Sequence, residues 1–140
     1  MGEAPYGDSP RDQGGGTGID RTPPQDLAAE QSVLGAMLMS KDAIADVVEV
    51  LKGRDFYRPA HELIYDAILD LYGRGEPADP VTVADELGKR GDISKVGGYV
   101  YLADLLASVS IAANAGYYAE SVRDKAASRF LMPVLPRAGW

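Results

Sequence analysis

The chain has 140 residues, 46% hydrophobic and 25% charged, which fits one small globular domain with a workable core. It has no cysteine and a single histidine, which excludes disulfides, zinc fingers and metal sites built on several histidines. Its net charge of −7 disfavours tight binding to nucleic acid, so proteins are the expected partners. The sequence shows no membrane-spanning run and no secretory signal, which predicts a cytoplasmic protein without a membrane partner.

The first helix is predicted after a polar N-terminal segment. Residues 1–22 are rich in glycine, proline and polar residues, and Tyr6 and Ile19 are their only large apolar side chains. Such a segment buries too little apolar surface to offset the entropy of ordering, so we expect a disordered tail. The apolar spacing then becomes helical, and Asp26 is placed to cap a helix over about residues 27–39.

Three further helices are expected in the middle of the chain. Ser40 can cap a second helix that runs to about Lys52. Pro59 suits the first turn of a third helix, because a first-turn proline loses no helical hydrogen bond. Asp79 and Pro80 provide a cap and a first-turn proline for a short fourth helix.

Two more helices and then a break are predicted in the last third of the chain. Gly97 and Gly98 open a fifth helix, and a sixth is expected over about residues 112–129. Residues 130–140 contain two prolines and break the helical pattern, so we expect either a truncation or a foreign tail. The predicted fold class is all-α, a compact bundle of about six helices over residues 23–129.

The sequence offers no catalytic centre. The phosphate-binding pattern G-x-x-x-x-G-K-[ST] is absent, and the nearest segment, residues 88–90, follows a helix and lacks the hydroxyl for magnesium. No activated nucleophile is evident, which argues against a small hydrolase. His61 is expected to pack or cap locally, and Asp66 and Asp70 to be solvated acids on a polar helix face. We therefore predict a non-enzymatic domain without catalytic residues, metal or cofactor.

Four tyrosines of the second half of the chain allow two interpretations. Tyr99, Tyr101, Tyr117 and Tyr118 could stack on nucleic-acid bases, but the basic groove that should accompany them is missing. We expect Tyr101 and one member of the Tyr117 and Tyr118 pair in the core. The other member is a candidate anchor for a protein partner, because tyrosine is favoured at interfaces.

Short motifs that follow one another in a fixed order connect this chain to a known family. The first is PQDLAAEQSVLGAML at residues 24–38. The later ones are Asp55-Phe56-Tyr57 with His61, Pro80-Val81-Thr82 with Leu87, Gly97-Gly98 with Tyr101-Leu102, and Ala113-Asn114-Ala115-Gly116-Tyr117-Tyr118-Ala119. Together they make residues 23–129 resemble the N-terminal domain of DnaB-type replicative DNA helicases.

The resemblance implies a collar and docking domain. Its last helix would lead into a helical hairpin, which is truncated here after about Arg129, and six copies would form a collar above a ring of ATPase motors. The implied partners are other copies of the helicase, as dimer and hexamer, and the C-terminal domain of primase, with a helicase loader as a further candidate. ATP and Mg would belong to the absent motor domain of the parent helicase, and DNA binding by this domain alone would be weak or absent.

Four residues of the last helix are the candidate partner-binding residues. They are Tyr118, Arg123, Lys125 and Arg129. We select them because the outward face of this helix must continue toward the hairpin that the resemblance implies. The alternative is that they are ordinary solvated helix positions.

A helix-turn-helix DNA-binding regulator is the competing interpretation. Residues 81–87 and 99–106, with a glycine-containing turn between them, have a compatible spacing. However, residues 24–129 contain 17 acidic and 11 basic side chains, so the basic shell that contacts phosphates would be missing.

Overall fold

The computed structural model describes residues 23–109 and 114–131, and these form six α-helices and two short 3-10 turns. The predicted tail at residues 1–22 lies outside them. The α-helices are α1 (Leu27–Met39), α2 (Lys41–Val48), α3 (Pro59–Gly73), α4 (Pro80–Lys89), α5 (Gly98–Ala107) and α6 (Ala115–Leu131). The 3-10 turns are η3 (Gly53–Asp55) and η4 (Ser94–Val96). The all-α prediction of about six helices is confirmed.

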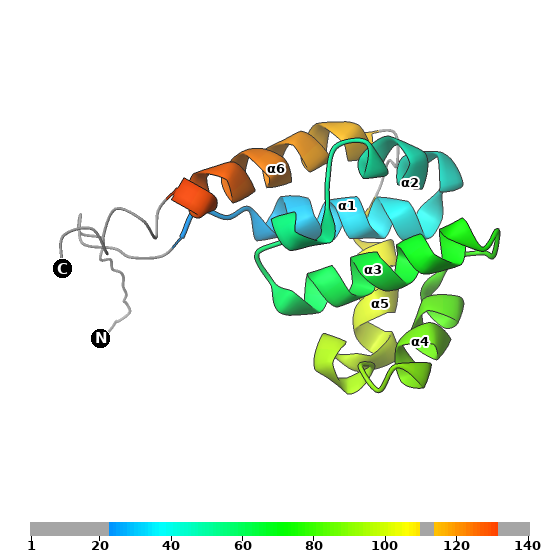
Figure 1. The fold of residues 1–140 in the computed structure, drawn as a ribbon. Helices are drawn as coiled ribbons and strands as arrows, with labels where there is room; N and C mark the ends of the chain where they lie inside the picture. Colours follow the sequence, from blue (N-terminus) through cyan, green and yellow to red (C-terminus); the bar gives the residue numbers. More distant parts are fainter. Residues whose placement is uncertain (1–22, 110–113, 132–140) are drawn as a thin grey trace, which may run out of the picture.

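Helix α1 is the centre of the bundle, because it packs against α2, α3, α5 and α6. Figure 1 shows α6 and α3 on opposite sides of α1, with α4 beyond α3. Most of α1 is buried, including glycine and charged positions that a surface helix would leave exposed. A helix buried nearly all round needs apolar residues on every face, which is why this segment is the most apolar stretch near the start of the chain.

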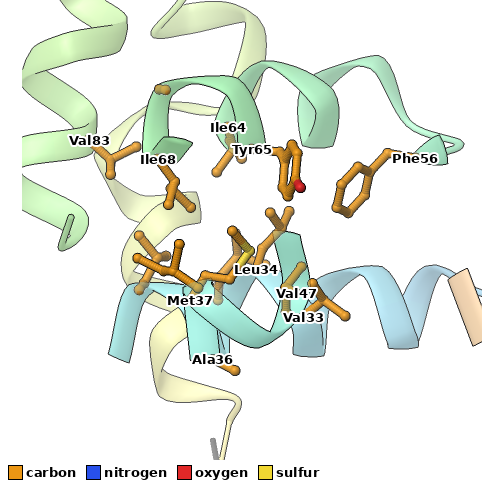
Figure 2. Packing of buried hydrophobic residues seen from close by; sticks show 14 of the residues in the cluster. Val33, Leu34, Ala36, Met37, Val47, Phe56, Ile64, Tyr65, Ile68 and Val83 are labelled. Atoms are coloured by element: carbon orange, nitrogen blue, oxygen red, sulfur yellow. The ribbon is translucent and has the colours of Figure 1, made fainter. Parts of the chain in front are cut away.

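One layer of the core lies between α1 and α3. In Figure 2, Ile64, Tyr65 and Ile68 of α3 point toward the side chains of α1, and Phe56 closes one end of the layer. The Phe56 and Tyr65 rings are 5.1 Å apart at a tilted angle, which is a favourable aromatic pair. Tyr65 is 1% exposed, and its hydroxyl donates to the carbonyl oxygen of Leu51 at 2.6 Å.

Several predicted helix starts are confirmed by their caps. The Asp26 carboxylate accepts the amide of Ala29 at 3.0 Å. The Ser40 hydroxyl accepts the amide of Ala43 at 3.3 Å. Asp79 caps α4 with Pro80 in its first turn, and these side-chain acceptors satisfy amides that a helix start leaves unpaired.

The second helix is shorter than predicted. It ends at Val48 rather than near Lys52, and the amides of Val50 and Leu51 both bond to the carbonyl of Val47 as the chain turns. This turn buries the Leu51 side chain and brings its carbonyl to the Tyr65 hydroxyl. A tertiary contact therefore overrides the local helical pattern here.

The break predicted at Phe130 is also misplaced. Phe130 and Leu131 remain helical, so α6 extends two residues past Arg129. Residues 132–140, the rest of the predicted tail, lie outside the described residues. The predicted start near Ala112 lies outside the described residues.

Candidate docking surface on the last helix

Small residues fix the orientation of α6. Ala115, Ala119, Val122 and Ala126 are all buried, and their spacing of three and four residues places them on one helix face. This face packs along α1, and small side chains permit a close approach of the two helices. The Ser121 hydroxyl adds a bond of 2.9 Å to the carboxylate of Asp26, the capping residue of α1. The opposite face of α6 is left open to solvent.

The structure separates the two tyrosines of α6. Tyr117 is 75% exposed, whereas Tyr118 is half-buried and packs against the core. Their rings meet edge to face with centroids 5.5 Å apart. The exposed member of this pair is therefore Tyr117, whereas Tyr118 is the candidate predicted from the sequence. The small-residue spacing on α6 was the signal that could have distinguished them, because Tyr117 lies opposite that face.

Arg123 and Lys125 are exposed as expected. Arg123 donates to the Glu120 carboxylate at 2.7 Å, one helical turn away. Lys125 lines a shallow hollow of about 280 Å³ on the outer side of α6. The remaining lining residues of this hollow are Tyr117, Glu120, Ser121 and Asp124. The outer face of α6 therefore combines one aromatic side chain with charges of both signs.

Arg129 turns toward the domain rather than toward solvent. Its guanidinium donates to the carbonyl oxygens of Pro24 at 3.0 Å and Asp55 at 2.5 Å. It also lies 5.4 Å from the centre of the Tyr57 ring, which is a cation–π distance. Arg129 thus anchors the end of α6, and the four candidates do not form one surface. The exposed apolar residues near it are Phe130 and Leu131, which are 54% and 71% exposed.

A buried polar network that was not predicted from the sequence lies on the other side of α1. Glu30 and His61 are 1% and 0% exposed, and His61 Nδ1 lies 2.7 Å from the Glu30 carboxylate. His61 Nε2 lies 2.6 Å from the hydroxyl of Tyr101, and Gln31 donates to the same hydroxyl at 3.3 Å. His61 packs locally as expected. Its hydrogen-bond partners lie 31 and 40 residues away in the sequence, so no local sequence pattern predicts these contacts.

A second polar cluster holds α4 on α3. The Glu86 carboxylate accepts from Arg74 at 3.0 Å and from Arg90 at 2.9 Å. These hydrogen bonds, first from Arg74 and then from Arg90, lower the pKa of Glu86. Arg90 also pairs with Asp70, so that Asp70 is ion-paired rather than free on the helix surface. Among the described residues, no group of three His, Cys, Asp or Glu side chains could hold a metal ion. No helix in this part of the chain is long and apolar enough to cross a bilayer.

Known proteins resemble this chain in both sequence and fold. The family model described as DnaB-like helicase N terminal domain matches residues 22–124. The chain is 67% identical over 112 residues to the replicative DNA helicase DnaB of Mycobacterium leprae, which covers 80% of this chain and 18% of that protein. The chain therefore spans less than a fifth of the length of this relative.

Two solved structures share the fold. The N-terminal domain of DnaB helicase from Mycobacterium tuberculosis superposes with a TM-score of 0.82 at 64% identity, covering 84% of this chain and 86% of that one. A DnaB-like replicative helicase, solved in a study of its interactions with primase, gives a TM-score of 0.68 at 26% identity, covering 80% of this chain and 26% of that one. The chain therefore belongs to the DnaB-like helicase N-terminal domain family.

Proposed function

We propose that this chain is the collar and docking domain of a hexameric replicative helicase, which associates with other copies and receives the C-terminal domain of a primase. The observation that carries the proposal is the match to the helicase N-terminal family over nearly all of the described helices. A related helicase of the same fold is described by its interactions with primase. The proposal places the domain at a replication fork in the cytoplasm and assigns ATP and Mg to a separate motor domain.

The open face of α6 is the proposed docking surface. Tyr117 provides a large and rigid contact area, and aromatic side chains dominate the energetics of many interfaces. Lys125 and Asp124 line the adjoining hollow and supply charges that would orient a partner. Phe130 and Leu131 extend the exposed apolar area toward the end of the helix. We retain Arg123 and Lys125 as candidate contact residues and add Tyr117.

Tyr118 and Arg129 have a different role in this proposal. Tyr118 packs on the core and Arg129 anchors α6. Replacing either residue would therefore destabilise the domain itself, and would weaken partner binding only through that loss. They would contribute to docking by holding the outer face of α6 in place. Their replacement by alanine should therefore lower the melting temperature as well as the affinity.

Titration of an isotope-labelled chain with a primase C-terminal domain, followed by nuclear magnetic resonance, tests the proposed surface. We expect shifts concentrated on the outer face of α6, and about tenfold weaker binding for Tyr117→Ala, because truncating an aromatic anchor commonly costs more than 1 kcal/mol. Tyr99→Ala, at an exposed tyrosine of α5, is the matched control and should bind normally. Shifts confined to α4 and α5 would show that the docking surface lies elsewhere.

The helix-turn-helix interpretation is set aside by the family assignment. The corresponding segments are α4 and α5, which are joined through η4. The two cations at the C-terminal end of α4 are engaged in ion pairs, Lys89 with Asp85 and the capping residue Arg90 with Glu86. They are therefore partly neutralised before any phosphate could approach, in keeping with weak DNA binding by this domain alone.

A further inference from the structure

The polar network around His61 forms a continuous series of contacts between distant helices. It starts at Tyr101 on α5, whose hydroxyl lies 2.6 Å from His61 Nε2 on α3. The two rings are also stacked, with centroids 5.9 Å apart and planes 10° from parallel. His61 Nδ1 then bonds to Glu30 on α1. Helices α3 and α5, which both pack on α1, are thus also joined to α1 and to each other through one imidazole.

The hydrogen-bond directions follow from the partners. A carboxylate only accepts, so His61 Nδ1 carries the proton that is donated to Glu30. A neutral imidazole with its proton on Nδ1 accepts from the Tyr101 hydroxyl at Nε2, whereas a protonated imidazole donates to this hydroxyl. The Tyr101 hydroxyl also accepts from Gln31. In both cases, removing the hydroxyl would leave Nε2 of a fully buried side chain without its partner.

From Glu30 the contacts continue into the backbone before α3. The Glu30 carboxylate accepts the amide of Tyr57 at 2.7 Å and the amide of Arg58 at 3.5 Å. Glu30 is therefore bonded to the imidazole and to two consecutive amides of one turn. A buried carboxylate that accepts several donors holds them strongly, because each bond is charge-assisted. The position of the turn at residues 55–58 depends on this side chain.

The same turn holds the end of α6. The Tyr57 ring lies under the guanidinium of Arg129, and the carbonyl oxygen of Asp55 accepts from it at 2.5 Å. Asp55 is itself fixed, since its carboxylate accepts the amide of Lys52 at 2.8 Å. Beyond Arg129, α6 presents two exposed apolar residues and gains little from packing. The last turn of α6 is therefore anchored through contacts of Arg129 to residues 55–57 and to the carbonyl oxygen of Pro24.

We propose that the Tyr101, His61 and Glu30 network is a conformational clamp that couples α5 to the C-terminal end of α6. While the network is intact, it holds the turn at residues 55–58, and that turn holds Arg129. When it is broken at Tyr101, the turn opens locally and the last turn of α6 is released, although no residue of α6 has been changed. This coupling concerns the domain by itself and stands independently of the proposed docking function.

Hydrogen exchange of the complete 140-residue chain tests the clamp. Local opening exposes amides without global unfolding, so exchange can be followed segment by segment. In Tyr101→Phe, we expect the amides of Tyr57, Arg58 and residues 126–131 to exchange about tenfold faster, which is the effect of losing one strong buried hydrogen bond. Tyr99→Phe, on the same helix but exposed, is the matched control and should leave these amides unchanged.

A second variant separates the clamp from a general loss of stability. Tyr65→Phe also removes one buried tyrosine hydroxyl, but this hydroxyl bonds to Leu51 outside the network. It should accelerate the amides around Leu51 and those that exchange only through global unfolding. Tyr101→Phe should instead accelerate Tyr57, Arg58 and residues 126–131 selectively. If the pattern of Tyr101→Phe matched that of Tyr65→Phe, or if its effect stayed within α3 and α5, the clamp would be disproved.

A double-mutant cycle gives an independent measurement. Tyr101 and Arg129 share no contact, and distant independent sites usually have additive effects. We expect the loss of melting temperature in the Tyr101→Phe, Arg129→Lys double variant to be clearly smaller than the sum of the two single losses, because either change releases the same turn. Additive losses would overturn the proposal.

Discussion

Gly35 of α1 lies so close to α5 that a Cβ atom at residue 35 would stand 2.3 Å from the carbonyl oxygen of Leu105. The same atom would stand 2.3 Å from the Cγ2 of Val109. Real Cβ atoms do not approach a backbone oxygen so closely, so a larger residue would force the two helices apart. The glycine within this largely buried helix is therefore explained by packing rather than by backbone conformation.

Gly35→Ala is expected to destabilise the domain by about 1–3 kcal/mol, which is typical of overpacking in a core. Chemical denaturation followed by circular dichroism measures this loss. Gly88→Ala is the matched control, because a Cβ at residue 88 of α4 meets nothing within 4 Å. There, alanine should raise stability by about 0.5–1 kcal/mol through its better helix propensity. A neutral effect of Gly35→Ala would contradict the close approach of α1 and α5.

Tyr65→Phe is expected to lower stability by about 1–2 kcal/mol at neutral pH, because the Leu51 carbonyl loses its buried donor. Burial, and then the nearby charges of Asp55 and Asp66, raise the pKa of Tyr65 from 10.0 to about 12. The folded state therefore keeps this proton while the unfolded chain loses it, and the wild type loses stability as the pH rises from 10 toward 12. The difference between wild type and variant should narrow over that range in denaturation experiments. A constant difference would contradict the raised pKa.

Asp66→Asn is expected to stabilise the domain. Partial desolvation at the surface of α3, followed by repulsion from Glu62 and Asp70 one turn away on either side, raises the pKa of Asp66 above its ordinary value of 3.8. The ionised form is thus disfavoured in the folded state, and the wild type loses stability as the pH rises above 3.8. The substitution removes two like-charge pairs. It should therefore raise the free energy of unfolding by about 0.5 kcal/mol at neutral pH, and by less at high salt.

Thermal melts of the wild type and Asp66→Asn at pH 7 and at about pH 3 test whether the substitution is stabilising. The gain should be present at pH 7 and vanish in acid, where the wild-type carboxyl is protonated in both states. Asp46→Asn, at another exposed acid in a helix, is a suitable control with little effect at either pH. A variant that is less stable than the wild type at pH 7 would contradict this account.

The helices could be predicted from the sequence because their signals are local. Asp26, Ser40 and Asp79 cap the helices as expected, and Pro59 and Pro80 occupy first turns. Each depends on a few neighbouring residues and on the 3.6-residue period. The end of α2 was placed too late because the turn at Leu51 depends on Tyr65, fourteen residues further along the chain.

The candidate site was predicted less well, because its geometry depends on contacts between residues that are far apart in the sequence. Exposure of Arg123 and Lys125 follows from helix geometry alone, whereas Arg129 is drawn inward by Pro24 and Asp55, which are far away in the sequence. The choice between Tyr117 and Tyr118 depended on which face of α6 meets α1. The network of Glu30 and His61 requires three helices to be packed before any of its bonds can form.

Light scattering coupled to size-exclusion chromatography, at several concentrations and with and without a primase C-terminal domain, tests the docking function most directly. We predict a defined complex whose mass equals the sum of its components, and weaker complex formation by Tyr117→Ala than by Tyr99→Ala. A chain that stays monomeric at every concentration and elutes separately from the primase domain would contradict the proposal that it is a docking module.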